Sequence, residues 1–243
     1  MIVFNSIKLY DLLFYFIIYS FMGWVMESSF KSLLYQKPIN SGFLRGPFIP
    51  IYAIGSLTVL TFFTPFIEST IFLFFLGFVG MTFIEFMAGY IMEKIFNISW
   101  WDYRGNFMNI GGKICLENSI YWGILSVALL KYIHPAIQNI VVSIPIGFGE
   151  KMLFTFIIYF IIDYTLTLIE VLDIQEKVKQ FLLIKENPII LATTNKVSEL
   201  KSFLIKRSKR LVTAYPKLTY LKVNKKLKDI IGKKERIVDK NIK

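Results

Sequence analysis

The feature that most restricts the fold of this chain is a series of five apolar segments, each able to cross a lipid bilayer. A membrane-spanning helix needs roughly 20 consecutive apolar residues. The composition agrees, because 55% of the 243 residues are hydrophobic and the mean hydropathy is +0.55, which is high for a soluble domain. The sequence therefore predicts an all-α integral membrane protein with spans at about 9–30, 48–67, 71–92, 114–130 and 152–172.

A further apolar stretch at 135–149 is too short for a sixth span, and Pro145 interrupts it. We expect an interfacial or re-entrant helix there.

The charge distribution divides the chain into a membrane part, 1–172, and a basic tail, 173–243. The tail holds 19 Lys and Arg against 7 Asp and Glu, a net charge of +12, whereas residues 1–172 hold 9 against 10. Within the tail, Pro188 and Pro216 interrupt expected helical pieces, and one apolar face is predicted from Val197, Leu200, Leu204 and Leu211. Two interpretations are open: the tail binds anionic lipid at the inner leaflet, or it only enforces the membrane topology.

The basic residues also predict the orientation. With the N-terminus outside, the cytoplasmic segments carry 25 Lys and Arg and the outer segments carry 3. Since Lys and Arg concentrate on the cytoplasmic side of membranes, we expect the N-terminus outside and the tail in the cytoplasm.

One short motif occurs twice, as Gly-Trp-Val-Met-Glu at 23–27 and Gly-Tyr-Ile-Met-Glu at 89–93, an offset of 66 positions. The same offset relates Asn40 to Asn106 and Gly46 to Gly112. This pattern predicts an internal repeat, with one helix pair at about 9–67 and another at about 71–130. Each pair crosses the membrane twice, so the repeats are parallel, and the last span completes a 2+2+1 arrangement.

Acidic residues inside the predicted spans need an explanation, because a charge at a helix centre costs about 2.5–3.5 kcal/mol on insertion scales. Glu85 and Asp163 fall near the middle of the third and fifth spans, and a proton-handling role or a protonated, hydrogen-bonded carboxyl group would each account for them. The other acids, Glu27, Glu93 and Glu117, fall near the cytoplasmic ends of their helices.

Two glycine-rich cytoplasmic loops, at 40–52 and 100–113, follow these acids and supply polar and basic side chains. We predict a polar inner cavity lined by the near-interface acids and closed by loop residues, with the candidate binding set Glu27, Glu93, Arg45, Asp102, Arg104, Asn106, Lys113 and Glu117. In the structural alternative, the same acids pair with the loop bases and only fix the helix ends.

Several kinds of chemistry find no support in the sequence. Cys115 is the only cysteine and His134 the only histidine, so a disulfide framework, a Cys- or His-rich metal site and a Ser-His-Asp mechanism are not expected. Gly112-Lys113 is not the end of a phosphate-binding loop, because Phe107 and Ile114 replace the required glycine and hydroxyl residue. We expect no catalytic constellation, no cofactor, no metal and no specific nucleic-acid module.

A group of motifs resembles one known family. They are the Gly-Trp-x-x-Glu helix end at 23–27, Asn-Ser-Gly-Phe-Leu at 40–44 with the following Gly-Pro and Pro-Ile-Tyr, Trp-Trp-Asp-Tyr at 100–103, and Ile-Cys-Leu at 114–116. In this order, over about 15–134, they are similar to the bacterial ABC-transporter type IV permease family. The resemblance implies a multi-pass protein of the bacterial plasma membrane, and a permease would need a separate ATPase subunit.

Three hypotheses for the function follow. The first is a permease component, with two copies forming the path and the acidic cavity accepting a cationic or polar solute, or coupling protons. The second is a membrane enzyme or regulator that binds a lipid headgroup through Glu27, Glu93, Asp102 and Arg45. The third is a scaffold whose basic tail recruits a partner.

Overall fold

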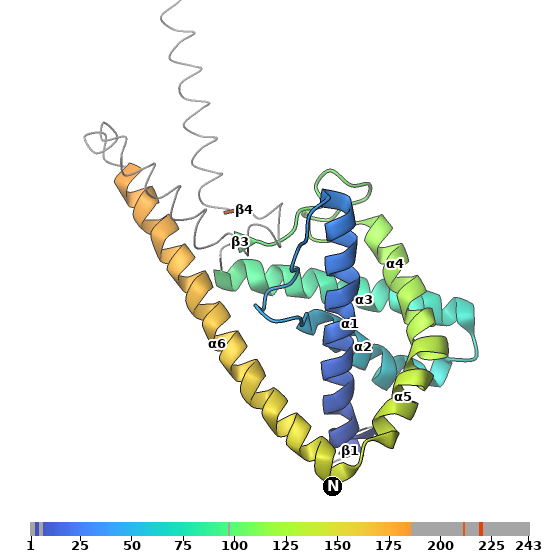
Figure 1. Ribbon diagram of the computed structural model, residues 1–243. Coiled ribbons are helices and arrows are strands. Elements are labelled where there is room, and N and C mark those ends of the chain that lie inside the picture. The colour runs from blue at the N-terminus through green and yellow to red at the C-terminus, as the bar shows by residue number, and fades with distance from the viewer. Residues whose placement is uncertain (1–2, 5–6, 97, 186–210, 212–218, 221–243) are drawn as a thin grey trace, which may run out of the picture. The chain divides into compact units, whose positions relative to one another are not determined.

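The computed structural model describes residues 3–4, 7–96, 98–185, 211 and 219–220, and these are mainly helical (Figure 1). The predicted tail features at Pro188, Val197, Leu200, Leu204 and Pro216 lie outside the described residues. Leu211 is described and is buried.

The long helices are α1 (Leu9–Tyr35), α3 (Thr70–Phe96) and α6 (Ile146–Lys185). Between α1 and α3, helix α2 (Pro50–Thr58) continues through a π turn and a 3₁₀ turn to Phe66. Helix α4 (Leu116–Ala128) passes through a π turn at Leu129–Ile133 into α5 (His134–Ser143). Two short antiparallel pairs complete the description: β1 (Val3–Phe4) with β2 (Ile7–Lys8), and β3 (Ile98–Ser99) with β4 (Thr219–Tyr220).

Among the residues that the structure describes, four helical segments are long and apolar enough to cross a membrane: Leu9–Tyr35, Thr70–Phe96, Leu116–Ser143 and Ile146–Asp173. They correspond to four of the five predicted spans. The remaining one is a shorter apolar helix, Pro50–Phe66, which ends at the turn before α3. The 2+2+1 arrangement therefore stays a prediction.

The stretch 135–149 differs from its expected form as a separate interfacial or re-entrant helix. Its first part, α5, extends the helical segment that begins with α4. Pro135 falls in the first turn of α5, directly after the π turn, where a missing backbone N–H is tolerated. The helix ends instead at Ile144, whose extended backbone (φ −75°, ψ 120°) is the conformation favoured before a proline.

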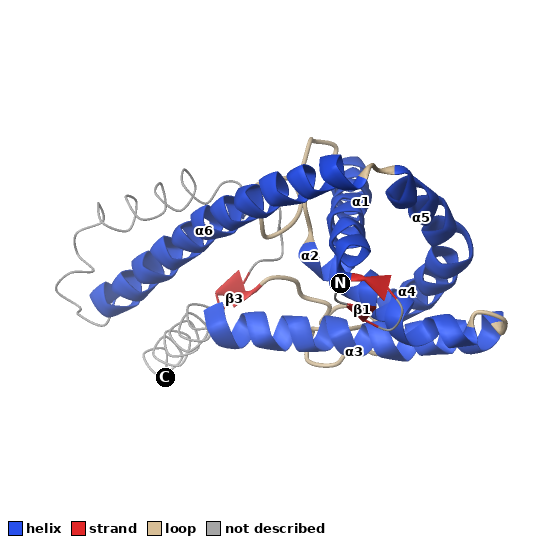
Figure 2. Ribbon diagram, turned by 90° about the horizontal axis from the view of Figure 1, so that it is seen from below, coloured by secondary structure: helices blue, strands red, loops and turns tan. Residues whose placement is uncertain are grey.

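Contacts divide the chain into two compact units, which we describe separately. The first unit is Met1–Ala88 with Tyr103–Leu168, and the second is Gly89–Asp102 with Ile169–Lys243. In the first unit, α1 packs on α2 and α5 (Figures 1 and 2). Its core includes Phe14, Tyr15, Leu60, Leu73 and Leu153. In the second unit, the ring of Phe96 packs edge-on against that of Trp100.

Glycines permit close helix contacts in the first unit. At Gly23 on α1, an added Cβ would overlap the base of the Tyr52 side chain on α2. At Gly77 on α3, it would overlap Ser126 on α4. These small residues let helix backbones approach closely, as is common in membrane proteins.

We predict that Gly23→Ala lowers the stability of the protein by about 1–3 kcal/mol, because the new methyl group overpacks a contact with Tyr52 that cannot relax easily. The matched control is Gly147→Ala on α6, where a Cβ meets nothing within 4 Å. The control should be neutral or stabilise by about 0.5–1 kcal/mol, as helical Gly→Ala changes do. Thermal unfolding in detergent measures both, and equal midpoints for the two variants would contradict the close contact.

Candidate functional site

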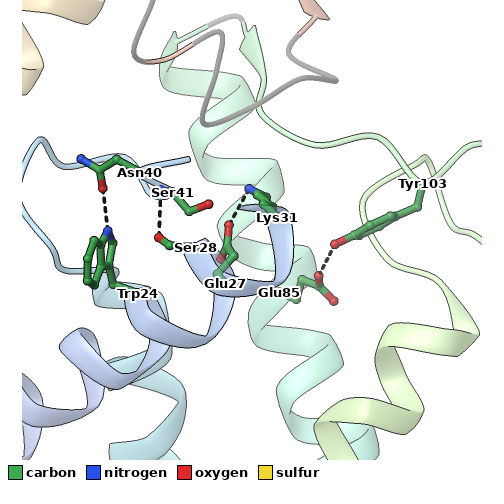
Figure 3. Close-up of polar contacts among 8 residues, drawn as sticks. All are labelled: Trp24, Glu27, Ser28, Lys31, Asn40, Ser41, Glu85 and Tyr103. Carbon is green, nitrogen blue, oxygen red and sulfur yellow. Dashed lines mark hydrogen bonds and ion pairs between the residues drawn. The ribbon is translucent and has the colours of Figure 1, made fainter. Parts of the chain in front are cut away.

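The loop between α1 and α2 is fixed to the end of α1. Gln36 ends this helix in a left-handed conformation (φ 52°). The returning chain brings Asn40 to Trp24, whose indole N–H donates to the Asn40 side-chain oxygen at 2.6 Å. The Ser41 backbone N–H donates to the Ser28 hydroxyl at 3.0 Å (Figure 3). The loop therefore has a defined conformation beside the helix that carries Glu27.

Asp163 on α6 holds the other side of this loop. Its two carboxylate oxygens accept the backbone N–H groups of Arg45 at 3.0 Å and Gly46 at 2.9 Å. Asp163 is buried, with 5% of its surface exposed. Asp163 thus engages both N–H groups, and this contact gives the buried acid a structural role.

Glu27 is the last residue of the Gly-Trp-Val-Met-Glu motif and lies on α1. Its carboxylate forms an ion pair with Lys31, one helical turn further along α1, at 2.6 Å. It also lies close to the phenol of Tyr52 and interacts with it electrostatically. Gly23 lies one turn before Glu27, and its missing side chain makes room for the Tyr52 ring. Because residues four apart share one face of a helix, Gly23 and Glu27 both face Tyr52 where α1 meets α2.

Glu85 on α3 is the most extensively hydrogen-bonded acid of the site. Its carboxylate accepts from the Trp122 indole at 2.9 Å, the Tyr103 hydroxyl at 3.2 Å and the Asn118 amide at 3.3 Å. Only 6% of its surface is exposed. Tyr103 lies in the second loop, and burial together with the Glu85 charge raises the pKa of its phenol well above the ordinary value. Tyr103 therefore stays protonated and keeps donating (Figure 3).

The two acid networks meet at Tyr52 and Trp122. Their rings lie 5.7 Å apart, centre to centre. Tyr52 interacts electrostatically with Glu85 as well as with Glu27.

A cavity of about 150 Å³ lies beside these rings, between α1, α2, α3 and α4. Its lining is mainly apolar and aromatic: Tyr19, Met22, Met26, Tyr52, Met81 and Trp122, with small residues between them. At its edge, the Tyr19 hydroxyl is 2.8 Å from Nδ1 of His134.

The remaining residues of the predicted cavity are divided between the two units. Glu117 is exposed on α4, where it accepts from Asn106 at 3.3 Å and from Tyr121 at 3.2 Å. Arg104 and Lys113 belong to the first unit with Glu27, whereas Glu93 and Asp102 belong to the second. A cavity shared by Glu27 and Glu93 stays a prediction.

The sequence analysis missed Tyr52, Tyr103, Asn118 and Trp122. The sequence did contain a clue. Each of these residues is an aromatic or amide hydrogen-bond donor, and acids inside apolar helices need such donors as partners. The part of the chain that the structure describes contains no group of three or more His, Cys, Asp or Glu able to hold a metal ion.

The long apolar helices define a helical membrane protein. A family model described as putative ABC-transporter type IV matches residues 14–168. The chain belongs to this family, which confirms the resemblance drawn from the loop motifs. No curated protein and no solved structure matches the chain.

We predict that Asp163→Asn loosens the first loop and lowers stability by about 1–3 kcal/mol, because one of two charge-assisted hydrogen bonds is lost. Hydrogen exchange at the Arg45 and Gly46 amides should accelerate. The control is Glu150→Gln, an exposed acid of the same helix, which should leave both amides protected. Unchanged exchange in Asp163→Asn would show that the loop does not depend on this carboxylate.

Proposed function

We propose that this protein is the membrane permease component of a transporter that acts with a separate ATPase subunit, and that its solute-binding site is the cavity beside Tyr52 and Trp122. The observation that carries the proposal is the position of two acids at the wall of a single cavity: Glu85 accepts from Trp122, and Glu27 lies close to Tyr52. Membership of the family supports the transport role.

The free-energy cost of placing these carboxylates in apolar segments indicates that they have a function there. A carboxylate in an apolar segment costs several kcal/mol unless partners compensate it. The chain commits Tyr103, Asn118 and Trp122 to Glu85. An apolar residue at position 85 would hold α3 and α4 together without these partners, so a charge or proton at this depth is the property that the arrangement supplies.

The proposal includes the predicted setting of the protein. It lies in the bacterial plasma membrane with the N-terminus outside and the tail inside, where the tail contacts anionic lipid. Two copies form the path, because one copy has few spans for a translocation route. Glu93, the repeat equivalent of Glu27, also contributes to transport.

The headgroup-binding alternative would depend on loop residues such as Arg45 and on backbone amides near Gly46. Because Asp163 already accepts both of these amides, the geometry favours the cavity over the loop as a ligand site.

We predict that the full-length protein, captured from its native membrane in mild detergent, retains an ATP-hydrolysing subunit. In liposomes that contain both proteins, Glu85→Gln should lower solute-stimulated ATP hydrolysis by about tenfold or more, since that loss corresponds to about 1.4 kcal/mol at the rate-limiting step. Glu27→Gln and Glu93→Gln should also impair it, with normal membrane abundance.

The control is Glu68→Gln, an exposed acid in the turn between α2 and α3, which should retain full activity. Two results would overturn the proposal: capture of no nucleotide-hydrolysing partner, or full activity in all three acid variants.

A further inference from the structure

We infer that the cavity between α1 and α4 binds a small organic cation that carries alkyl groups, such as a quaternary ammonium ion. This inference rests on the proposed function and names the class of its solute. It follows from the lining of the cavity, the groups behind that lining and the balance of charge around them.

The lining suits an alkylated cation. Tyr19, Tyr52 and Trp122 provide aromatic rings, which attract cations within about 6 Å of a ring centre and recognise quaternary ammonium groups in other proteins. Met22 and Met81 add polarisable thioethers that contact alkyl groups. A volume of about 150 Å³ fits a ligand smaller than those of typical drug-sized pockets, which occupy roughly 300–1,000 Å³.

Acids behind the rings strengthen this preference. The Trp122 indole donates to Glu85 at 2.9 Å, and the Tyr52 ring lies close to the Glu27 carboxylate. Donation to a carboxylate polarises the donor and increases the negative character of its ring, an effect that is larger at low dielectric constant. Of the three aromatic rings in the lining, Trp122 thus donates to a buried carboxylate, Glu85, and Tyr52 lies beside the half-buried Glu27.

The charge balance points to one positive charge on the ligand. Glu27 is already paired with Lys31. Every hydrogen bond that the structure gives Glu85 comes from a neutral donor, which disperses the carboxylate charge without cancelling it. A monovalent cation in the cavity would neutralise this charge, and ligand and ionised carboxylate would stabilise each other.

The same features exclude other ligand classes. A small inorganic cation requires oxygen ligands in place of its hydration shell, whereas this wall presents mainly carbon and sulfur. An anion would face the acids behind the rings. A neutral apolar molecule would fit the surface but would gain nothing from Glu85.

The test uses purified full-length protein without an ATPase, so that it does not depend on partner capture. Binding of choline is compared with binding of its uncharged isostere, in which carbon replaces nitrogen, by calorimetry in nanodiscs. We expect choline to bind at least about tenfold more tightly, because a desolvated cation–π contact is worth about 2 kcal/mol. Equal affinity, or no binding of either compound, would overturn the inference.

Variants locate the site. Glu85→Gln should weaken choline binding by about tenfold while leaving the isostere unaffected, and Ser56→Leu should fill the cavity and abolish binding. The control variant Glu68→Gln should bind choline as tightly as the unmodified protein does. Unchanged choline affinity in Ser56→Leu would place the cation elsewhere, even if Glu85→Gln fails to fold. Normal choline binding without an ATPase partner would preserve this inference while contradicting the permease role.

Discussion

The first unit depends on the burial of one carboxylate, Glu85, within three hydrogen bonds from neutral donors. Placing an acid near the middle of a membrane helix is costly, and the cost is met only if the donors surround it in a fixed geometry. Those donors come from the second loop, through Tyr103, and from α4, through Asn118 and Trp122. The same interaction thereby joins α3, the loop and α4, and it brings Trp122 to the wall of the cavity.

A second set of contacts builds the opposite wall. Gly23 admits the Tyr52 ring against α1, close to Glu27 one helical turn away. The loop between these helices is held by Trp24 on one side and by Asp163 on the other. Acids, aromatic donors and a close glycine contact thus act together, and their common product is an aromatic cavity with negative charge behind it. This arrangement links the fold to the proposed solute class.

Much of the fold follows from local patterns. Long apolar runs predicted the spans that match α1, α3, α6 and the α4–α5 segment, and the loop motifs led to the family. The second span and the stretch at 135–149 were harder, because a proline is compatible with either a helix end or a first helical turn. A π turn precedes both Pro65, where the helix ends, and Pro135, where it continues, so the local sequence does not show the outcome. Glu85 and Asp163 were found from the cost of a charge inside a span, and Glu27 was found from the repeated motif. Their partners were not, because Tyr52 and Trp122 resemble ordinary interfacial aromatics until tertiary contacts bring them together. The partners of Asp163 could not be found from the sequence either, because they are backbone amides 117 and 118 positions away.

The most direct test of the central claim is a double-mutant cycle between Glu85→Gln and Trp122→Phe, measured as unfolding free energy in detergent. If the indole N–H donates to a buried carboxylate, the two changes remove one shared interaction. Their effects should then be non-additive, with a coupling energy of about 1–3 kcal/mol. Effects that add to within about 0.5 kcal/mol would show that Glu85 and Trp122 act independently, and the account of the cavity wall would fail.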